Sequence, residues 1–314
     1  MSSLLKCMQL SLPLAALALP TKEEAPAVTA IHPIGPPLEE FRSYWSNSNA
    51  TIPEVATISQ QDLLHQRSTE QPPSPPQNRQ QPGSPASKRW VNGGVDDRVQ
   101  YNDQSYPYAA MGKLGFPGGY CTGSLLGPRH VAAARHCYVA NQPYVFQPDY
   151  NAGDVFPSAS VSTILLSNRD GDGDGGDCFS EDDWAVFVLS DRLGDAHGYL
   201  GARVAVPSDA GQAKFVNFGY PGDLSGGNRP YRQTGVTATR VGGCDRAGPG
   251  PAHTVLDCSG GQSGSSLFVT ESSGAYSYGV LSTAYVSGDV VVDSVFAGGV
   301  TWVNAIGYAR SNWA

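Results

Sequence analysis

From residue 90 onward, the chain alternates short apolar runs with stretches rich in glycine, proline, asparagine and aspartate. Runs this short have the length of β-strands rather than of helices. The clearest runs cover 120–126, 131–134, 184–189, 215–218, 278–285 and 290–296. Their regular punctuation predicts an all-β domain built as a sandwich or a barrel. One short helix is predicted at the C-terminus, over Trp302–Trp313.

The N-terminus has the pattern of a secretory signal peptide. Lys6 precedes an apolar stretch from Met8 to Leu19, which contains the small-x-small sequence Ala16-Leu17-Ala18. We predict a signal peptide over 1–18 and a secreted protein; a buried N-terminal strand is the alternative. No apolar run approaches the ~20 residues of a membrane-spanning helix, so no membrane partner is expected.

Residues 19–89 have a different composition from the rest of the chain. The Pro/Gln/Ser-rich tract that begins at Gln71 offers too little apolar surface to order itself, so we predict a largely disordered propeptide. An amphipathic portion, 38–52, is a candidate for docking. The tract ends at Lys88-Arg89, a dibasic pair typical of processing sites, although such a pair also occurs as solvated charge in linkers. Cleavage there would leave a mature chain over 90–314.

Charge and composition narrow the functional class. The formal net charge of −8 argues against nucleic-acid binding, which requires a basic face. The 37 glycines, the 24 prolines and the low content of charged residues (15%) favour short strands and turns over long helices.

A candidate nucleophile stands in the sequence Gly260-Gly261-Gln262-Ser263-Gly264-Ser265. Glycines on both sides allow a tight turn that projects the serine and makes nearby N–H groups converge. Such a turn predicts an oxyanion hole made by the N–H groups of Gly261 and Ser263. By itself, the motif is equally consistent with a glycine-rich hairpin that contains a serine.

A candidate general base lies upstream, where His136 follows the apolar run 131–134. The neighbouring Cys137 and the earlier Cys121 would close the hairpin with a disulfide and fix the imidazole. A lone histidine is usually structural, but this setting favours a general base.

The third candidate is Asp183, directly before the apolar run 184–189. A carboxylate at the start of a buried strand needs a partner, and orienting a histidine would supply one. Asp182 is the alternative. The resulting chain order of His, Asp and Ser is that of the chymotrypsin arrangement.

The region 95–310 resembles the glutamyl-endopeptidase (V8-like, bacillary type) branch of the trypsin-fold serine proteases. The resemblance rests on Asp96-Asp97-Arg98, Tyr106-Pro107-Tyr108, Cys121-Thr122-Gly123, His136-Cys137, Gly219-Tyr220-Pro221-Gly222-Asp223 and the stretch 257–265. It implies two six-stranded antiparallel β-barrels, at about 90–200 and 201–314, with the three candidate residues at their junction. It also implies hydrolysis of protein or peptide substrates through an acyl-enzyme, a monomer, the propeptide as a partner, and no cofactor.

The S1 pocket departs from the pattern of this branch. Leu281 occupies the place of the histidine that receives the substrate glutamate in these relatives, and a leucine donates no hydrogen bond. Asp257 and Cys258 are further S1 candidates. Gln262 replaces the aspartate that pairs with the new N-terminus in trypsin-like enzymes, so that activation switch is absent. In glutamyl-specific relatives the mature α-amino group lies near the acidic side chain of the substrate. The resemblance therefore implies that the α-amino group of Trp90, freed by cleavage after Arg89, is a candidate partner for a substrate carboxylate.

Two features lie outside the three catalytic candidates. We predict a second disulfide between Cys244 and Cys258, which leaves Cys178 as the odd thiol. The acidic stretch 170–181 matches the spacing of a calcium loop at Asp170, Asp172, Asp174 and Glu181. A solvated acidic turn is the favoured interpretation, because flanking helices are not predicted.

Two other classes of function compete with a serine endopeptidase. A catalytically silent protease homologue would serve as an extracellular binding module, but such proteins usually lose a catalytic residue. A calcium-binding module would require that the acidic stretch binds calcium and that the three catalytic candidates have no catalytic role.

Overall fold

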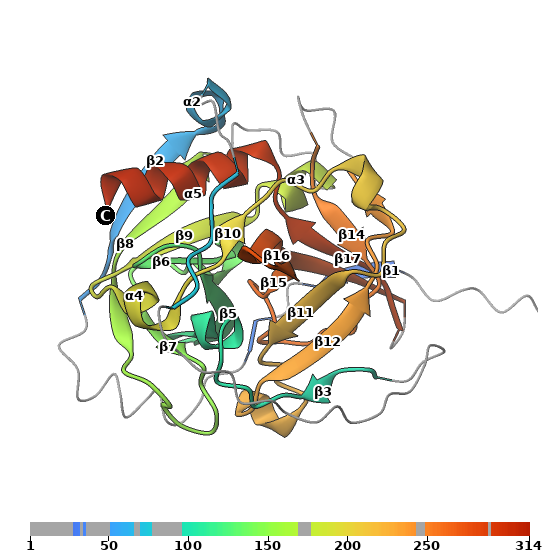
Figure 1. The fold of residues 1–314 in the computed structure, drawn as a ribbon, viewed down its shortest axis with the longest axis horizontal. Helices are drawn as coiled ribbons and strands as arrows, with labels where there is room; N and C mark the ends of the chain where they lie inside the picture. Colours follow the sequence, from blue (N-terminus) through green and yellow to red (C-terminus); the bar gives the residue numbers. More distant parts are fainter. Residues whose placement is uncertain are drawn as a thin grey trace, which may run out of the picture.

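The computed structural model describes residues 28–31, 34–35, 51–65, 70–76, 96–168, 177–242, 249–287 and 290–314. In these residues the protein is built mostly of strands, arranged as a closed barrel beside a second sheet (Figure 1). The predicted signal peptide and the pair Lys88-Arg89 lie outside the described residues.

The barrel closes because every neighbouring pair of its six strands is hydrogen-bonded, including β7 with β4 and β8 with β9. Apolar side chains such as Leu114, Val131 and Phe187 fill a fully buried core. In order around the ring, the strands are β4 (Met111–Phe116), β5 (Gly119–Leu125), β6 (His130–Ala134), β9 (Trp184–Leu189), β8 (Ala159–Asn168) and β7 (Val145–Pro148).

The second sheet follows in the sequence and has its own apolar cluster around Phe215, Leu267 and Phe296. Its order is β13-β14-β17-β16-β15-β11-β12-β3, and β1 and β10 pair with β16 outside this path. The strands are β1 (Val28–Ile31), β3 (Val99–Gln100), β10 (Gly201–Ala202), β11 (Phe215–Gly219), β12 (Tyr231–Val236), β13 (Arg240–Val241), β14 (Ala252–Thr254), β15 (Ser266–Glu271), β16 (Gly274–Ser287) and β17 (Val290–Ala297).

The mostly-β class, the barrel and the C-terminal helix are thus confirmed. Over its described residues the second sheet contains ten strands rather than the six expected, because short segments add to its edges. The C-terminal helix α5 (Val300–Asn312) begins slightly earlier than predicted and buries Trp302 and Ile306 in the core. Shorter helices are α3 (Asp177–Glu181) and α4 (Leu193–His197). No described helix has both the length and the apolar character needed to cross a membrane.

Parts of the predicted propeptide are ordered, which corrects the expectation of disorder for them. The strand β2 (Glu54–Ser59) runs parallel to β8, and the helix α2 (Gln60–His65) lies beside α5 (Figure 1). Within 70–76, Gln71 and Ser74 form backbone bridges to the chain around β10. The tract is apolar-poor, as predicted, but backbone hydrogen bonds to neighbouring segments order it. Of the amphipathic portion 38–52, only its last two residues are described.

Candidate active site

Three segments bring His136, Asp183 and Ser263 together between the barrel and the second sheet. His136 lies in a single 3₁₀ turn (Arg135–Cys137) that directly follows β6. Asp183 stands immediately before β9, the strand paired with β6. Ser263 belongs to the loop that leads into β15. The site therefore depends on both halves of the fold.

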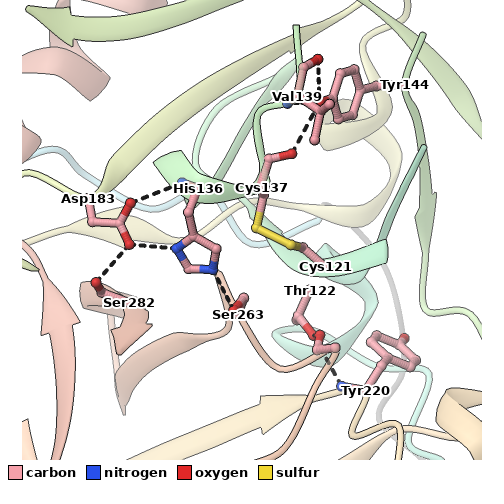
Figure 2. Close-up of a disulfide and its surroundings, with 11 residues drawn as sticks. Cys121, Thr122, His136, Cys137, Val139, Tyr144, Asp183, Tyr220, Ser263 and Ser282 are labelled. Carbon is pink, nitrogen blue, oxygen red and sulfur yellow. Dashed lines mark hydrogen bonds and ion pairs between the residues drawn. A yellow bond between two sulfur atoms is a disulfide. The ribbon is translucent and has the colours of Figure 1, made fainter. Parts of the chain in front are cut away.

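The three side chains form a continuous hydrogen-bonded chain (Figure 2). His136 Nδ1 lies 2.6 Å from Asp183 Oδ2, and His136 Nε2 lies 2.7 Å from Ser263 Oγ. The backbone N–H of His136 also donates to Asp183 Oδ1, at 2.9 Å. Both Asp183 and Ser263 are buried, whereas His136 is partly exposed. This arrangement can pass a proton between the serine hydroxyl and the imidazole.

Ser282 was not singled out in the sequence, yet it contacts the acidic member of this group. Its buried hydroxyl donates a 2.7 Å hydrogen bond to Asp183 Oδ2 (Figure 2). No distinctive signal in the sequence pointed to Ser282, because the same strand carries further hydroxyl side chains at Ser277, Thr283 and Ser287. Asp182, the alternative acid, instead accepts a hydrogen bond from the Gln60 side chain.

The serine loop is held by backbone contacts that require glycine. Gly261 has a φ of 100°, and a Cβ there would lie 2.3 Å from the carbonyl oxygen of Tyr220. Thr122 Oγ1 donates to the carbonyl of Gly261 at 2.8 Å and accepts from the N–H of Tyr220 at 3.1 Å. The N–H of Thr122 donates to the carbonyl of Ser263 at 2.9 Å. Thr122 therefore ties the loop to β5.

Arg98, which precedes the barrel in the sequence, holds the same serine loop. Its guanidinium donates to Gln262 Oε1 at 2.8 Å and pairs with Asp96 at 2.7 Å and with Asp223 at 2.6 Å. Burial alone would lower the pKa of Arg98, but its bonds to the two carboxylates raise it. Burial also opposes ionisation of both carboxyls, yet Arg98 holds the pKa of each below its usual value. The sequence resemblance included Arg98 without assigning it this contact.

The cysteines follow the prediction only in part. Cys121 and Cys137 form the predicted disulfide, beside His136 (Figure 2). The predicted Cys244–Cys258 pairing is wrong, because Cys258 carries a free thiol. This thiol packs against the apolar cluster of the second sheet, and burial raises its pKa to about 12. Cys244 and the side chain of Cys178 lie outside the described residues.

The S1 candidates occupy different environments. Leu281 is fully buried in the second core, and its backbone pairs with Ser265. Asp257 is half-buried and accepts a 3.1 Å hydrogen bond from the backbone N–H of Asp97. Burial raises the pKa of Asp257. Trp90 lies outside the described residues.

The calcium-loop candidates are largely outside the described residues. Glu181 ends α3 and is buried, whereas Asp170, Asp172 and Asp174 are not described. Across the part of the chain that the structure describes, no group of three or more His, Cys, Asp or Glu side chains is placed to hold a metal ion. The calcium loop stays a prediction.

Comparison with known proteins supports the resemblance seen in the motifs. No protein-family model matches the chain. A glutamyl endopeptidase of Bacillus licheniformis is 28% identical over 227 residues, which is 70% of this chain and 68% of the relative. Similarity to the glutamyl endopeptidases, predicted from the motifs, is thereby confirmed.

Solved structures confirm the chymotrypsin-like fold. A Glu endopeptidase in complex with MPD matches with a TM-score of 0.56 and 24% identity, over 70% of this chain and 99% of that chain. A thermostable serine protease, AL20, from an extremophilic microorganism matches with a TM-score of 0.50 and 18% identity, over 65% of this chain and 98% of that chain.

Proposed function

We propose that this protein is a serine endopeptidase that hydrolyses peptide bonds in protein or peptide substrates through an acyl-enzyme. The observation that carries the proposal is the hydrogen-bonded chain from Asp183 through His136 to Ser263. The similarity to a glutamyl endopeptidase supports the same reaction class. The name of that relative describes its own activity, and the geometry here supports extending the reaction to this chain.

In this mechanism, Ser263 Oγ attacks the carbonyl carbon of the substrate while His136 Nε2 takes the hydroxyl proton. The proton then passes to the amine nitrogen as the C–N bond breaks, and the acyl group remains on Ser263. Water, deprotonated by His136, hydrolyses this ester and restores the serine. Asp183 holds the imidazole by its Nδ1–H and stabilises the imidazolium.

The N–H groups of Gly261 and Ser263 are proposed to receive the oxyanion. No backbone hydrogen bond within the described residues uses either group as a donor. The hydrogen bond from Thr122 to the carbonyl of Gly261 holds the loop in its turn. Donors fixed in advance in this way stabilise developing charge without reorganisation.

Specificity for the residue before the cleaved bond is proposed to differ from that of glutamyl endopeptidases. Asp257, Cys258 and Leu281 are the proposed S1 residues. Leu281 offers no donor, and a carboxylate buried against it would be left without a partner at a cost of several kcal/mol. Unless the α-amino group of Trp90 receives the carboxylate, cleavage after glutamate is expected to be weak.

We also propose the maturation steps that the sequence predicts. The signal peptide over 1–18 directs secretion, and cleavage after Lys88-Arg89 separates the propeptide over 19–89 from the mature chain over 90–314. The mature protein is proposed to act as a monomer, with its own propeptide as a partner.

Cleavage-site profiling of the processed protein on a denatured protein mixture tests the proposal, with Ser263→Ala as the control. We expect new N-termini in the wild-type digest alone, and labelling of Ser263 by a fluorophosphonate. Cleavage confined to sites after glutamate would overturn the specificity proposal. No cleavage and no labelling would instead support the silent homologue.

A further inference from the structure

We propose that residues 28–31 and 34–35 occupy the surface on which a peptide substrate would bind, in the orientation of a substrate. This surface, called the peptide-binding cleft below, consists of the edge of β16 and of Tyr120. The N-terminal region of the chain would thereby inhibit its own active site. This inference rests on the proposed function. It goes further by naming the inhibiting segment and the surfaces that hold it.

The first contact is a strand added to the edge of β16. Residues Val28 to Ile31 (β1) pair antiparallel with Ser287 to Ala284 of β16. On its other side, this part of β16 pairs with β17. Without β1, its backbone N–H and C=O groups would form an open edge, the kind of surface on which an extended peptide adds as a strand.

This edge lies beside the catalytic group. Ala284, the partner of Ile31, is two residues from Ser282, and Ser282 donates its hydrogen bond to Asp183. The direction of β1 leads the chain from Val28 toward this point. Val28 is 60% exposed, so β1 is held through its backbone rather than through side-chain burial. Backbone recognition of this kind is how a protein binds extended peptides of varied sequence.

The second contact is to Tyr120 of β5, the strand whose Thr122 holds the serine loop. The N–H of Gly35 donates to the carbonyl of Tyr120 at 2.9 Å, and the N–H of Tyr120 donates to the carbonyl of Gly35 at 3.3 Å. Tyr120 directly precedes Cys121, whose disulfide ends at Cys137 beside His136. The carbonyl of Ile34 lies against the backbone of Gly260, because a Cβ on Gly260 would be 2.6 Å from it.

The two contacts enclose the nucleophile. Ile31 pairs beside Ser282, Ile34 touches the start of the serine loop, and Gly35 pairs beside the disulfide. Ile31 and Gly35 are four residue steps apart, which limits their separation to roughly 14 Å, so both contacts lie within one short stretch of the site. A peptide substrate would need the same backbone groups of β16 and Tyr120, so the two occupants exclude each other.

The rest of the N-terminal region holds the segment near the site. The strand β2 pairs with β8, Leu63 of α2 is fully buried, and the chain over 70–76 bridges to the region around β10. A tethered segment competes at an effective concentration in the millimolar range. Because these contacts involve residues well before Lys88-Arg89, cutting that pair does not by itself empty the cleft. Activity therefore requires a separate loss of the contacts made by 28–31 and 34–35.

The substitution Gly35→Ala tests the inference in the full chain. A Cβ at Gly35 would lie 2.2 Å from Tyr120 Cε1, so the alanine displaces the segment. We expect a fluorophosphonate to label Ser263 at least about tenfold faster in this variant than in the wild type, as a loss of about 1.4 kcal/mol of binding predicts. Thr29→Ala, which changes an exposed side chain in β1 and keeps its backbone, is the matched control and should label like the wild type.

Amide hydrogen exchange at Ala284–Ser287 gives a readout that does not depend on activity. Slower exchange there in the wild type than in Gly35→Ala supports an occupied cleft, and circular dichroism checks that the variant is folded. Equal exchange and equal labelling in the two proteins would overturn the inference. A third outcome separates the two proposals. If the amides exchange more slowly in the wild type than in Gly35→Ala but the probe labels neither protein, the inference that the segment occupies the cleft holds, and the proposed enzymatic function is contradicted.

Discussion

The carboxylate of Asp183 accepts the hydrogen bonds that orient the proposed general base. It accepts from the backbone N–H of His136 at one oxygen, and from His136 Nδ1 and Ser282 Oγ at the other. A buried carboxylate is costly unless such bonds compensate the loss of water. The same bonds fix the orientation of the carboxylate. Removing any one of them by substitution should therefore lower kcat.

Ser282→Ala removes one of these bonds and should lower kcat with little effect on KM. Hydrogen bonds to charged groups contribute about 1.5–3 kcal/mol, which corresponds to a loss between about tenfold and a hundredfold. Steady-state kinetics on a peptide substrate measures the split. Ser277→Ala is the control, because this buried hydroxyl of the same strand bonds to Ser266 and Gly279. An equal loss in both variants would mean that strand packing, and not the aspartate, is responsible.

The two neighbouring aspartates should respond differently to amidation. Asp183→Asn replaces the carboxylate that accepts the hydrogen bond from the imidazole Nδ1–H with an amide, which no longer holds the imidazole in the correct tautomer. This substitution should reduce kcat by a factor on the order of 10⁴. Asp182→Asn should keep turnover near the wild-type level, because Asp182 bonds to Gln60 rather than to His136. Kinetics of the two variants side by side checks the assignment, and the reverse ranking would transfer the role to Asp182.

At the scale of elements, the docking of α2 and β2 depends on a small apolar contact. Leu63 is fully buried against the core that includes α5, and Asn304 of α5 donates to the carbonyl of Leu63 at 2.5 Å. Its neighbour Leu64 is 44% exposed. One side chain of this helix therefore anchors the element, and the adjacent one is a control of identical chemistry.

Leu63→Ala should weaken the docking of residues 51–65 by about 2–5 kcal/mol, the usual cost of emptying a buried leucine site. Leu64→Ala should change it by no more than about 0.5 kcal/mol. The measurement is amide hydrogen exchange of α2 in a Ser263→Ala background, which prevents self-digestion. Equal exchange in the two variants would show that Leu63 does not hold the helix.

At the scale of the whole molecule, Arg98 links the segment before the barrel to the serine loop. Its side chain is 6% exposed, whereas those of Asp96 and Asp223 are 41% and 48% exposed. Water screens the two carboxylates, so the pairs stabilise the fold only modestly. Their contribution depends on pH, because Arg98 lowers the pKa of both carboxyls, against the opposing effect of burial.

Carboxyls with a lowered folded-state pKa stabilise the protein above their ordinary pKa of 3.8, and this stability is lost as the pH falls through the lowered value. Arg98→Gln should therefore reduce the free energy of unfolding at pH 7, and its difference from the wild type should shrink below pH 3.8. Urea unfolding at the two pH values measures this. Arg192→Gln, in a pair with side chains 43% and 55% exposed, should have little effect at either pH. A difference that persists in acid would assign the stabilisation to neutral contacts such as Gln262.

The sequence by itself determined the features that depend on near neighbours. Short apolar runs separated by turn-forming residues set the strands, because runs of this length match strands rather than helices. The glycines around Ser263 predicted its tight turn, and the cysteines at either end of the hairpin beside His136 predicted the Cys121–Cys137 disulfide. The predicted Cys244–Cys258 pairing was wrong, since spacing along the chain does not establish that two thiols meet in space.

Only the tertiary structure decided which distant groups meet. It placed Asp183, the residue preferred from the sequence, rather than Asp182 beside His136, and Ser282 against that carboxylate. It also paired 28–31 with β16 and Gly35 with Tyr120. It also ordered the polar tract at 70–76, for which composition predicted disorder. The physical reason is common to these cases. Backbone hydrogen bonds and buried polar contacts form between segments far apart in the sequence, and neither composition nor periodicity specifies such partners.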